Sequence, residues 1–162
     1  MKKNLQESEA EAYREALEDH VSKVRSRLLH FAAVMTFRAK HHDDSKFEEP
    51  EFSKFAEVHD QLSDTTYMSD EYKDLLDVLD DALDHHYANN SHHPEYYEGG
   101  LQGFDLFDLV EMFCDWSAAV EKHEDGDIYE SIEKNKDRFG YDDVLASIFR
   151  NTADVFTSSN QK

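Results

Sequence analysis

Residues 17–35 read LEDHVSKVRSRLLHFAAVM, and this stretch decides the fold class. Its apolar residues return at three- and four-residue steps, which is the spacing of one face of an α-helix. They are Leu17, Val21, Val24, Leu28, Phe31, Ala32 and Met35. The pattern predicts a long helix over about residues 7–38, with His20 on or beside its apolar face. Only five Gly and two Pro interrupt the chain, and β-branched runs are absent, so the helical periodicity indicates an all-α protein.

Similar apolar spacing predicts further helices on the C-terminal side of this stretch. A short helix is expected over 50–62, because proline is tolerated in a first helical turn. Ser69 or Asp70 can cap the next helix, which carries His86. A loop over 89–103 holds Pro94 and three glycines, and later helices are expected over 105–122, 128–138 and 142–156. The polar tail 157–162 is expected to fray. The sequence therefore predicts one domain over residues 1–162, with roughly six helices.

Charge and cysteine content exclude several classes of protein. The formal net charge is -20, which disfavours direct binding to nucleic acids or to an anionic membrane. A small phosphorylated substrate remains compatible with this charge, since a bound cation can invert the local field. Cys114 is the single cysteine, so an intramolecular disulfide is excluded and a reducing compartment is expected. Neither a signal peptide nor a membrane span is apparent, and the predicted location is the cytoplasm.

Histidines and aspartates occur at spacings that suit a buried metal site. Histidine nitrogen and carboxylate oxygen are the ligands of hydrolytic metal centres. The predicted ligands are His20, His42, Asp43, His86, His92, His93 and Asp115. The expected cofactor is a divalent metal, as one or two ions, and these residue types do not distinguish Mn, Fe, Zn, Co and Mg. Such centres usually hydrolyse phosphate esters or related bonds.

The sequence pattern also bears on which residues bind the metal and which orient its ligands. His86 continues the apolar stripe of its helix, three residues after Leu83, whereas His85 falls beside aspartates; His86 is therefore preferred as the ligand. Glu111 shares a helix face with Asp115, where it could orient a ligand histidine. The alternatives are a solvated acidic face for these carboxylates and a polar surface loop for His92 and His93.

The segment HHDDSKF (41–47) resembles the HD superfamily of metal-dependent phosphohydrolases, which is all-α. That family has an upstream His, an adjacent His-Asp pair and a later Asp. His20, His42, Asp43 and Asp115 match these roles in order. The resemblance implies an HD-like helical bundle. Lys46 resembles the lysine of HD-x-G-K variants, although Ser45 stands where Gly is usual.

Members of that superfamily with two or three metals have extra histidines between the doublet and the last Asp. His86, His92 and His93 look like these ligands. Asp43, next to His42, can bridge two ions. The segments HHYANNSHHPEYY (85–97) and EMFCDW (111–116) are also similar to a largely phage-borne, HD-like family of unknown function. That second resemblance covers residues 18–156. If the chain is phage-encoded, its location would be the host cytoplasm.

The expected function is a phosphohydrolase or phosphodiesterase that acts on a nucleotide or similar small phosphate ester through a metal-bound hydroxide. Asp43 and Lys46 would be catalytic, and Lys46, Glu95 and Arg138 would contact the substrate. The alternative is a non-catalytic metal- or nucleotide-binding module that regulates a partner, for a phage protein a host partner. An acidic DNA mimic would explain the charge but not the histidines. A homo-oligomer is compatible with the sequence.

Overall fold

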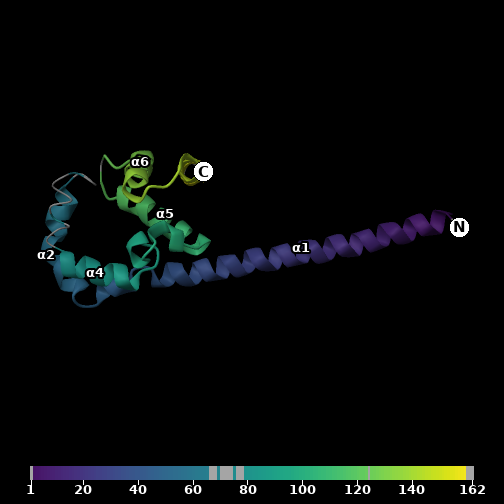
Figure 1. The fold of residues 1–162 in the computed structure, drawn as a ribbon, viewed down its shortest axis with the longest axis horizontal. Coiled ribbons are helices and arrows are strands. Elements are labelled where there is room, and N and C mark those ends of the chain that lie inside the picture. The colour runs from purple at the N-terminus through teal and green to yellow at the C-terminus, as the bar shows by residue number, and fades with distance from the viewer. Residues whose placement is uncertain (1, 66–68, 70–74, 76–78, 124, 160–162) are drawn as a thin grey trace. The chain divides into compact units, whose positions relative to one another are not determined.

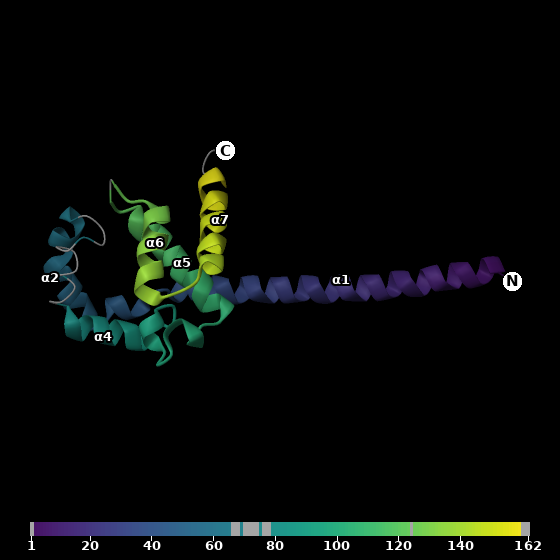
Figure 2. The ribbon, with the colours of Figure 1, turned by 45° about the horizontal axis from the view of Figure 1, so that its top comes forward.

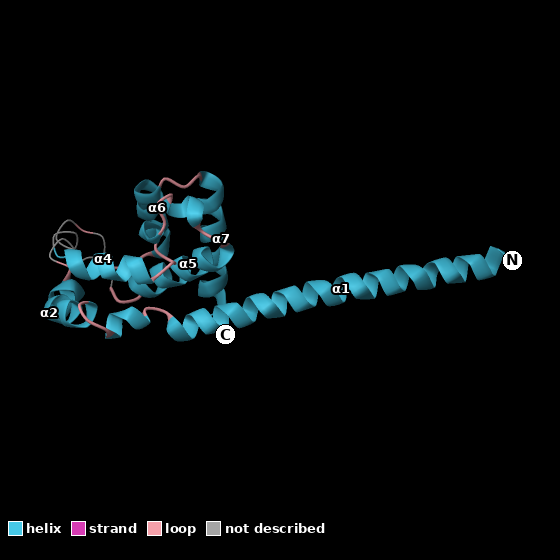
Figure 3. Cartoon of the chain, turned by 60° about the horizontal axis from the view of Figure 1, so that its bottom comes forward, coloured by secondary structure: helices cyan, strands magenta, loops and turns pink. Residues whose placement is uncertain are grey.

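The structure is a computed structural model that describes residues 2–65, 69, 75, 79–123 and 125–159. All regular elements in these residues are helical, and none is a strand (Figure 3). The all-α prediction is therefore confirmed. The α-helices are α1 (Lys2–His41), α2 (Glu51–Asp64), α4 (Asp80–Asn89), α5 (Leu106–Val120), α6 (Ile128–Phe139) and α7 (Asp143–Ser159), as Figure 1 shows. Three short 3-10 helices are η1 (Asp44–Phe47), η2 (Pro94–Tyr96) and η3 (Gly100–Gly103).

The helix boundaries differ from the predicted ones mainly at the ends. α1 is longer than the expected 7–38 at both ends. The predicted start of the next helix at Ser69 or Asp70 cannot be compared, because 70–74 and 76–78 lie outside the described residues. The fraying expected for the tail 157–162 stays a prediction. The α7 helix continues through Ser159, and the Thr157 hydroxyl donates to the carbonyl oxygens of Ala153 and Asp154. Residues 160–162 lie outside the described part.

The chain divides into two units, residues 1–40 and 41–162. The described part of the first unit is one uninterrupted helix, α1 (Figure 2). The second unit contains all the other helices that the described residues form. The prediction of a single domain over 1–162 stays a prediction. Among the described residues, no helix is both long and apolar enough to cross a membrane.

The core of the second unit lies among α5, α6 and α7. The α6 helix packs against both α5 and α7. The Trp116 ring stacks on Phe139 at 6.2 Å between centroids, and Phe113 stacks on Phe149 at 5.4 Å. This apolar cluster consists of Met112, Phe113, Trp116, Ile132, Tyr141, Ala146, Phe149 and Ala153. It holds α5 in place, and α5 carries two of the acidic site residues.

A capping box begins α5. The Asp105 carboxylate accepts hydrogen bonds from the backbone N–H groups of Phe107 and Asp108, at 2.7 and 3.0 Å. In return Asp108 accepts from the backbone N–H of Asp105 at 3.2 Å. Such reciprocal bonds satisfy the free N–H groups of a first helical turn. They set the rotation of α5, and so the face on which Glu111 and Asp115 lie.

The α2 helix packs against α4, and both contact η1. Val58 on α2 is buried, as are Leu79 and Ala82 at the start of α4. This packing brings the first residue of α2, Glu51, beside the last turn of α4, which carries His86.

We expect Ile132→Ala to destabilise the second unit. Ile132 is 0% exposed within the apolar cluster. Removing such a side chain costs the lost burial plus a cavity, about 2–5 kcal/mol. The free energy of unfolding in urea would measure the change. The control is Ile148→Ala, since Ile148 is 51% exposed and surface substitutions usually stay within about 0.5 kcal/mol. Equal effects of the two substitutions would contradict the assigned core.

Candidate metal centre

Asp43 is the candidate ligand that two groups of the second unit share. It lies between α1 and η1 with φ of 57°, in the left-handed region. Asp and Asn enter this region more readily than other side chains with a Cβ atom. The Asp43 side chain is only 13% exposed. An unusual backbone conformation at a buried carboxylate is a reason to look for a functional site.

The first group of candidate ligands consists of Asp43, His86, His92 and His93. One ligand atom from each lies within 4.8 Å of the others. Asp43 Oδ1 is 3.6 Å from His86 Nε2 and 3.5 Å from His92 Nε2. When donors bind one ion at about 2.0–2.2 Å in tetrahedral geometry, their atoms lie roughly 3.3–3.6 Å apart. These two distances therefore fit donors to a common ion.

A second group consists of His42, Asp43 and Asp115. His42 Nε2 lies 3.4 Å from Asp43 Oδ2 and 3.7 Å from Asp115 Oδ1. Asp43 thus faces the first group with one carboxylate oxygen and His42 with the other. A third group, His42, His92 and Glu111, overlaps both. The arrangement could hold two cations with Asp43 between them.

Two buried atoms of the first group have no hydrogen-bond partner among the described residues. They are Asp43 Oδ1 and His92 Nε2. A buried polar atom left unpaired costs about 1–3 kcal/mol, so proteins rarely tolerate one. Here the two atoms face each other at 3.5 Å. A cation between them would satisfy both, which makes the first group the better fitted of the two.

Carboxylates fix the orientation of two histidines. His86 donates from Nδ1 to Glu51 at 2.8 Å, and His42 donates from Nδ1 to Glu111 at 2.9 Å. In each ring Nε2 then faces the candidate ligands. Metal-binding histidines usually have such a carboxylate partner, which fixes the tautomer and raises ligand basicity. Glu51 is 0% exposed and also accepts from His85 Nδ1 at 2.6 Å.

Hydrogen bonds to Asp108 hold the loop that carries His92 and His93. The Ser91 hydroxyl donates to Asp108 Oδ1 at 2.6 Å, and the Tyr97 hydroxyl donates to Oδ2 at 2.9 Å. The Asp108 carboxylate, which is also part of the capping box of α5, therefore ties both sides of the histidine pair to that helix. Ligand histidines on a loop need this kind of support to keep their geometry.

The surroundings set the charge of each candidate ligand. Burial, followed by the neighbouring His92 and His86, lowers the pKa of His93 to about 3. Burial also lowers the pKa values of His86 and His92. These three rings are therefore neutral near pH 7, as metal ligands must be.

In the second group, the neighbouring carboxylates and His42 shift one another's pKa values. Contacts with Asp115 and then Glu111 raise the pKa of His42 to about 10. Burial opposes ionisation of Asp115, but His42 and then Lys46 outweigh it and lower the pKa of Asp115 to about 2. The carboxylates Asp43, Glu51, Glu111 and Asp115 converge here, and the ammonium of Lys46 lies 2.6 Å from Asp43 Oδ2. The raised pKa of His42 indicates a strongly negative electrostatic field at this site, and such a field favours bound cations.

The predicted ligands are only partly brought together. His42, Asp43, His86, His92, His93 and Asp115 all occur in the groups above. His86, rather than His85, faces the group, as its place on the apolar stripe indicated. His20 is exposed in the middle of α1 in the first unit and belongs to none of the groups that the described residues form. Its role as a ligand rests on the sequence alone.

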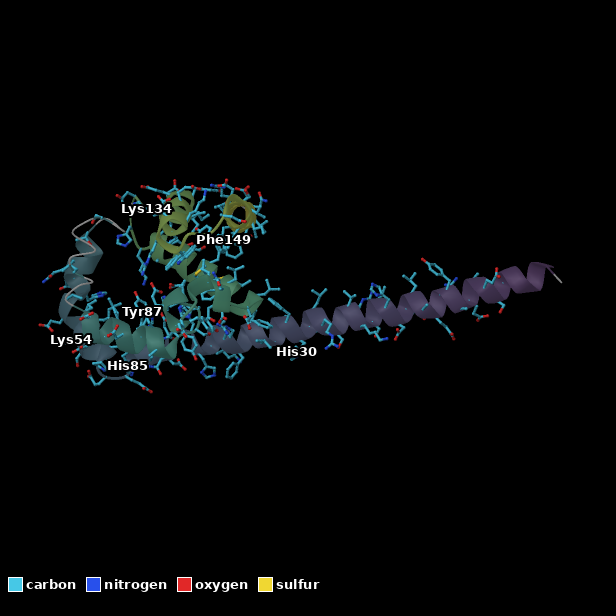
Figure 4. The ribbon with its side chains drawn as sticks, viewed as in Figure 1. His30, Lys54, His85, Tyr87, Lys134 and Phe149 are labelled. Carbon is cyan, nitrogen blue, oxygen red and sulfur yellow. The ribbon has the colours of Figure 1, made fainter. Side chains whose placement is uncertain are left out.

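The predicted substrate contacts Glu95 and Arg138 line one cavity. It measures about 770 Å³ and also has Tyr97, Gly100 and Tyr141 in its wall. Arg138 donates to Glu95 Oε1 at 2.7 Å. The cavity reaches Pro94, the residue directly after His93. The α4 helix places His85 and Tyr87 on its last turns, as Figure 4 shows, and the Tyr87 ring lies 5.1 Å from that of His93.

Sequence reasoning missed Glu51. It directly follows Pro50 in a first helical turn, where an acidic residue usually faces solvent and favours the helix dipole. Nothing in the local pattern distinguishes it from Glu48 or Glu49. Its burial depends on the packing of α2 against α4, which is a tertiary effect.

Comparison with known protein families identifies the family of this chain. The model of the Family of unknown function (DUF5662) matches residues 9–157, which is most of the chain. The chain belongs to this family. This finding agrees with the expected resemblance to a family of unknown function. No characterised protein and no protein of known structure gave a significant match.

We expect Glu51→Gln to weaken metal binding by about 10–100-fold, the usual effect of removing a partner that orients a ligand histidine. His85 and His86 donate to different oxygens of Glu51, and in Gln one of these oxygens becomes an NH2 group that cannot accept. Competition with a chromophoric chelator would measure the affinity. The control is Glu48→Gln, since Glu48 is exposed and directly follows η1. An unchanged affinity in Glu51→Gln would show that His86 does not need this carboxylate for binding.

Proposed function

We propose that this protein is a metal-dependent phosphohydrolase that acts on a nucleotide or a similar small phosphate ester. The observation that carries the proposal is the position of Asp43 between two groups of candidate ligands, with Oδ1 facing His86 and His92 and Oδ2 facing His42. Carboxylate-bridged pairs of cations are typical of enzymes that cleave phosphate esters. The resemblance of the HHDDSKF segment to the HD superfamily supports the same reaction class.

The ligands proposed for the two ions follow from these groups. Asp43, His86, His92 and His93 would hold one ion, and His42, Asp43 and Asp115 would hold the other. A bound divalent cation would supply Lewis acidity and lower the pKa of a coordinated water to about 7. Glu51 and Glu111 keep the histidine rings oriented. His42 would have to release its proton on metal binding, so binding should be coupled to proton release.

Lys46 and Arg138 are the proposed contacts to the substrate. Lys46 uses one donor on Asp43, and its side chain is 40% exposed, so further N–H donors remain for a phosphate oxygen. The organic part of the substrate would occupy the cavity next to Pro94, which Tyr97 and Tyr141 line. Arg138 could exchange Glu95 for a second phosphate oxygen, because a guanidinium offers several donors.

A regulatory module is the second candidate. It is favoured by one observation: Lys46 and Arg138 are each already paired with a carboxylate, Asp43 and Glu95. A cation that stays paired stabilises the resting protein and gives no attraction to a phosphate. The test is metal analysis of the purified protein, followed by phosphate release from a nucleotide panel with added Mn, Fe, Co, Zn or Mg. Full metal loading without turnover on the whole panel would favour this second candidate.

We expect Lys46→Met to retain its metal but to lower kcat/KM by about 100-fold, the size expected when one charged contact to a transition state is lost. Metal binding should not fall, since the substitution removes a cation from beside Asp43. Lys54→Met is the matched control because Lys54 is exposed on α2 (Figure 4). If Lys46→Met keeps full activity, the lysine has no role in the reaction.

A further inference from the structure

The α1 helix carries an apolar stripe with the repeat of a coiled coil. Leu17, Val21, Val24, Leu28, Phe31 and Met35 follow one another at alternating steps of four and three residues. A strict seven-residue repeat of this kind favours a left-handed supercoil with another helix, whereas a helix on a globular core usually shows a wider stripe. This stripe is therefore expected to pack against a second long helix.

Much of the stripe is exposed on α1. Leu17 is 46% exposed, Val24 43% and Leu28 65%. Figure 4 shows side chains all around this helix, including His30. Large apolar side chains that share one exposed face usually mark an interaction site.

The charges on α1 identify the partner. Residues 7–19 contain six Asp or Glu and a single Arg, whereas residues 20–41 contain five Lys or Arg and no acidic residue. Two parallel copies of this helix would place acidic half against acidic half and basic half against basic half. Two antiparallel copies would pair each acidic half with a basic half. Charges beside a coiled-coil seam select partner and orientation in this way.

We propose that α1 binds α1 of a second copy of this chain as an antiparallel coiled coil. The register with nearly full overlap places Val21 of one copy opposite Val24 of the other. The same register places Leu17 opposite Leu28, and it brings Glu18 beside Arg25 on both sides of the dyad. The proposal rests on the repeat and the charge pattern of α1, and it is independent of the proposed function.

Light scattering on the full chain after size exclusion tests the association. Wild type is expected at twice the chain mass of 18.9 kDa. Val21→Glu with Val24→Glu places charges in the seam and should give a monomer. The control, Ser22→Glu with Ser26→Glu, adds the same charge away from the stripe and should remain a dimer. A monomeric wild type, or a dimer that survives the seam substitutions, would overturn the proposal.

Charge exchange tests the pairing without disturbing the stripe. Glu18→Arg alone and Arg25→Glu alone should each weaken the dimer, because each creates like-charged neighbours. The combination should restore it, since the two residues exchange places in the same pairs. A combined variant as weak as the sum of the single ones would rule out the antiparallel register.

Disulfide formation tests the orientation directly. In a Cys114→Ser background, Leu17→Cys and Leu28→Cys are made in separate chains. In the antiparallel dimer only a mixture of the two should cross-link on mild oxidation. Within either variant alone the cysteines would be about 16 Å apart along the axis, at 1.5 Å per residue. Cross-linking of each variant with itself, and not in the mixture, would contradict the proposal.

Discussion

Asp43→Asn is expected to lose both metal ions and all hydrolytic activity. Asp43 is shared by two ligand groups, so its replacement removes one donor from each. Partners that only orient a ligand already contribute about 10–100-fold to affinity, and a shared ligand should therefore contribute more than about 100-fold. Metal content by elemental analysis and phosphate release would measure the two losses.

Asparagine is the appropriate replacement because it tolerates the left-handed backbone at φ of 57°. Its side chain can still accept a hydrogen bond from Lys46, so the local fold should be kept. Asp44→Asn is the matched control, since Asp44 is adjacent and exposed, and it undergoes the same chemical change. Full metal content in Asp43→Asn would disprove the bridging role.

The same pair of variants gives a readout that does not depend on activity. A ligand that binds only the folded protein stabilises it by RT ln(1 + [L]/Kd), which is about 2.7 kcal/mol at 100 times Kd. Added metal should therefore raise the free energy of unfolding of wild type and Asp44→Asn. Asp43→Asn should show no such gain at the same metal concentration.

The helices of this protein were predictable because their signals are local. The steps between Leu17 and Met35 define a helix whatever surrounds them. Gly140, in the left-handed conformation with φ of 69°, ends α6 where a C-terminal glycine is expected. Boundaries were less exact, because capping contacts such as those between Asp105 and Asp108 depend on individual hydrogen bonds.

The candidate ligands of the site were predictable from the sequence, whereas the residues that orient them were not. His42, Asp43, His86, His92, His93 and Asp115 are chemically distinctive, and their residue types alone suggest a cation. Glu51 and Asp108 are ordinary acidic residues in first helical turns, and only packing shows that one orients His86 and the other holds the histidine loop. His20 has the chemistry of a ligand, yet chemistry alone does not place it near the others.

Replacing His92 and His93 together with Ala is expected to lower the metal content of a fully loaded chain by about one ion. Both belong to the first group of candidate ligands, whereas the second group, His42, Asp43 and Asp115, contains neither. Two of four donors to one ion would be lost, and Asp43 would remain for the other ion. Elemental analysis after equilibration with excess metal and gel filtration would count the ions.

The matched control is His30→Ala with His59→Ala, which removes two exposed histidines and should leave the metal content unchanged. His42→Ala should also leave one ion, because it affects the second group, while Asp43→Asn should leave none. The difference in metal content between these two variants distinguishes two sites that share Asp43 from two independent sites. If the His92 and His93 variant retains every ion, these two buried histidines are not metal ligands. A loss of all metal would instead show that the two groups do not bind their ions independently.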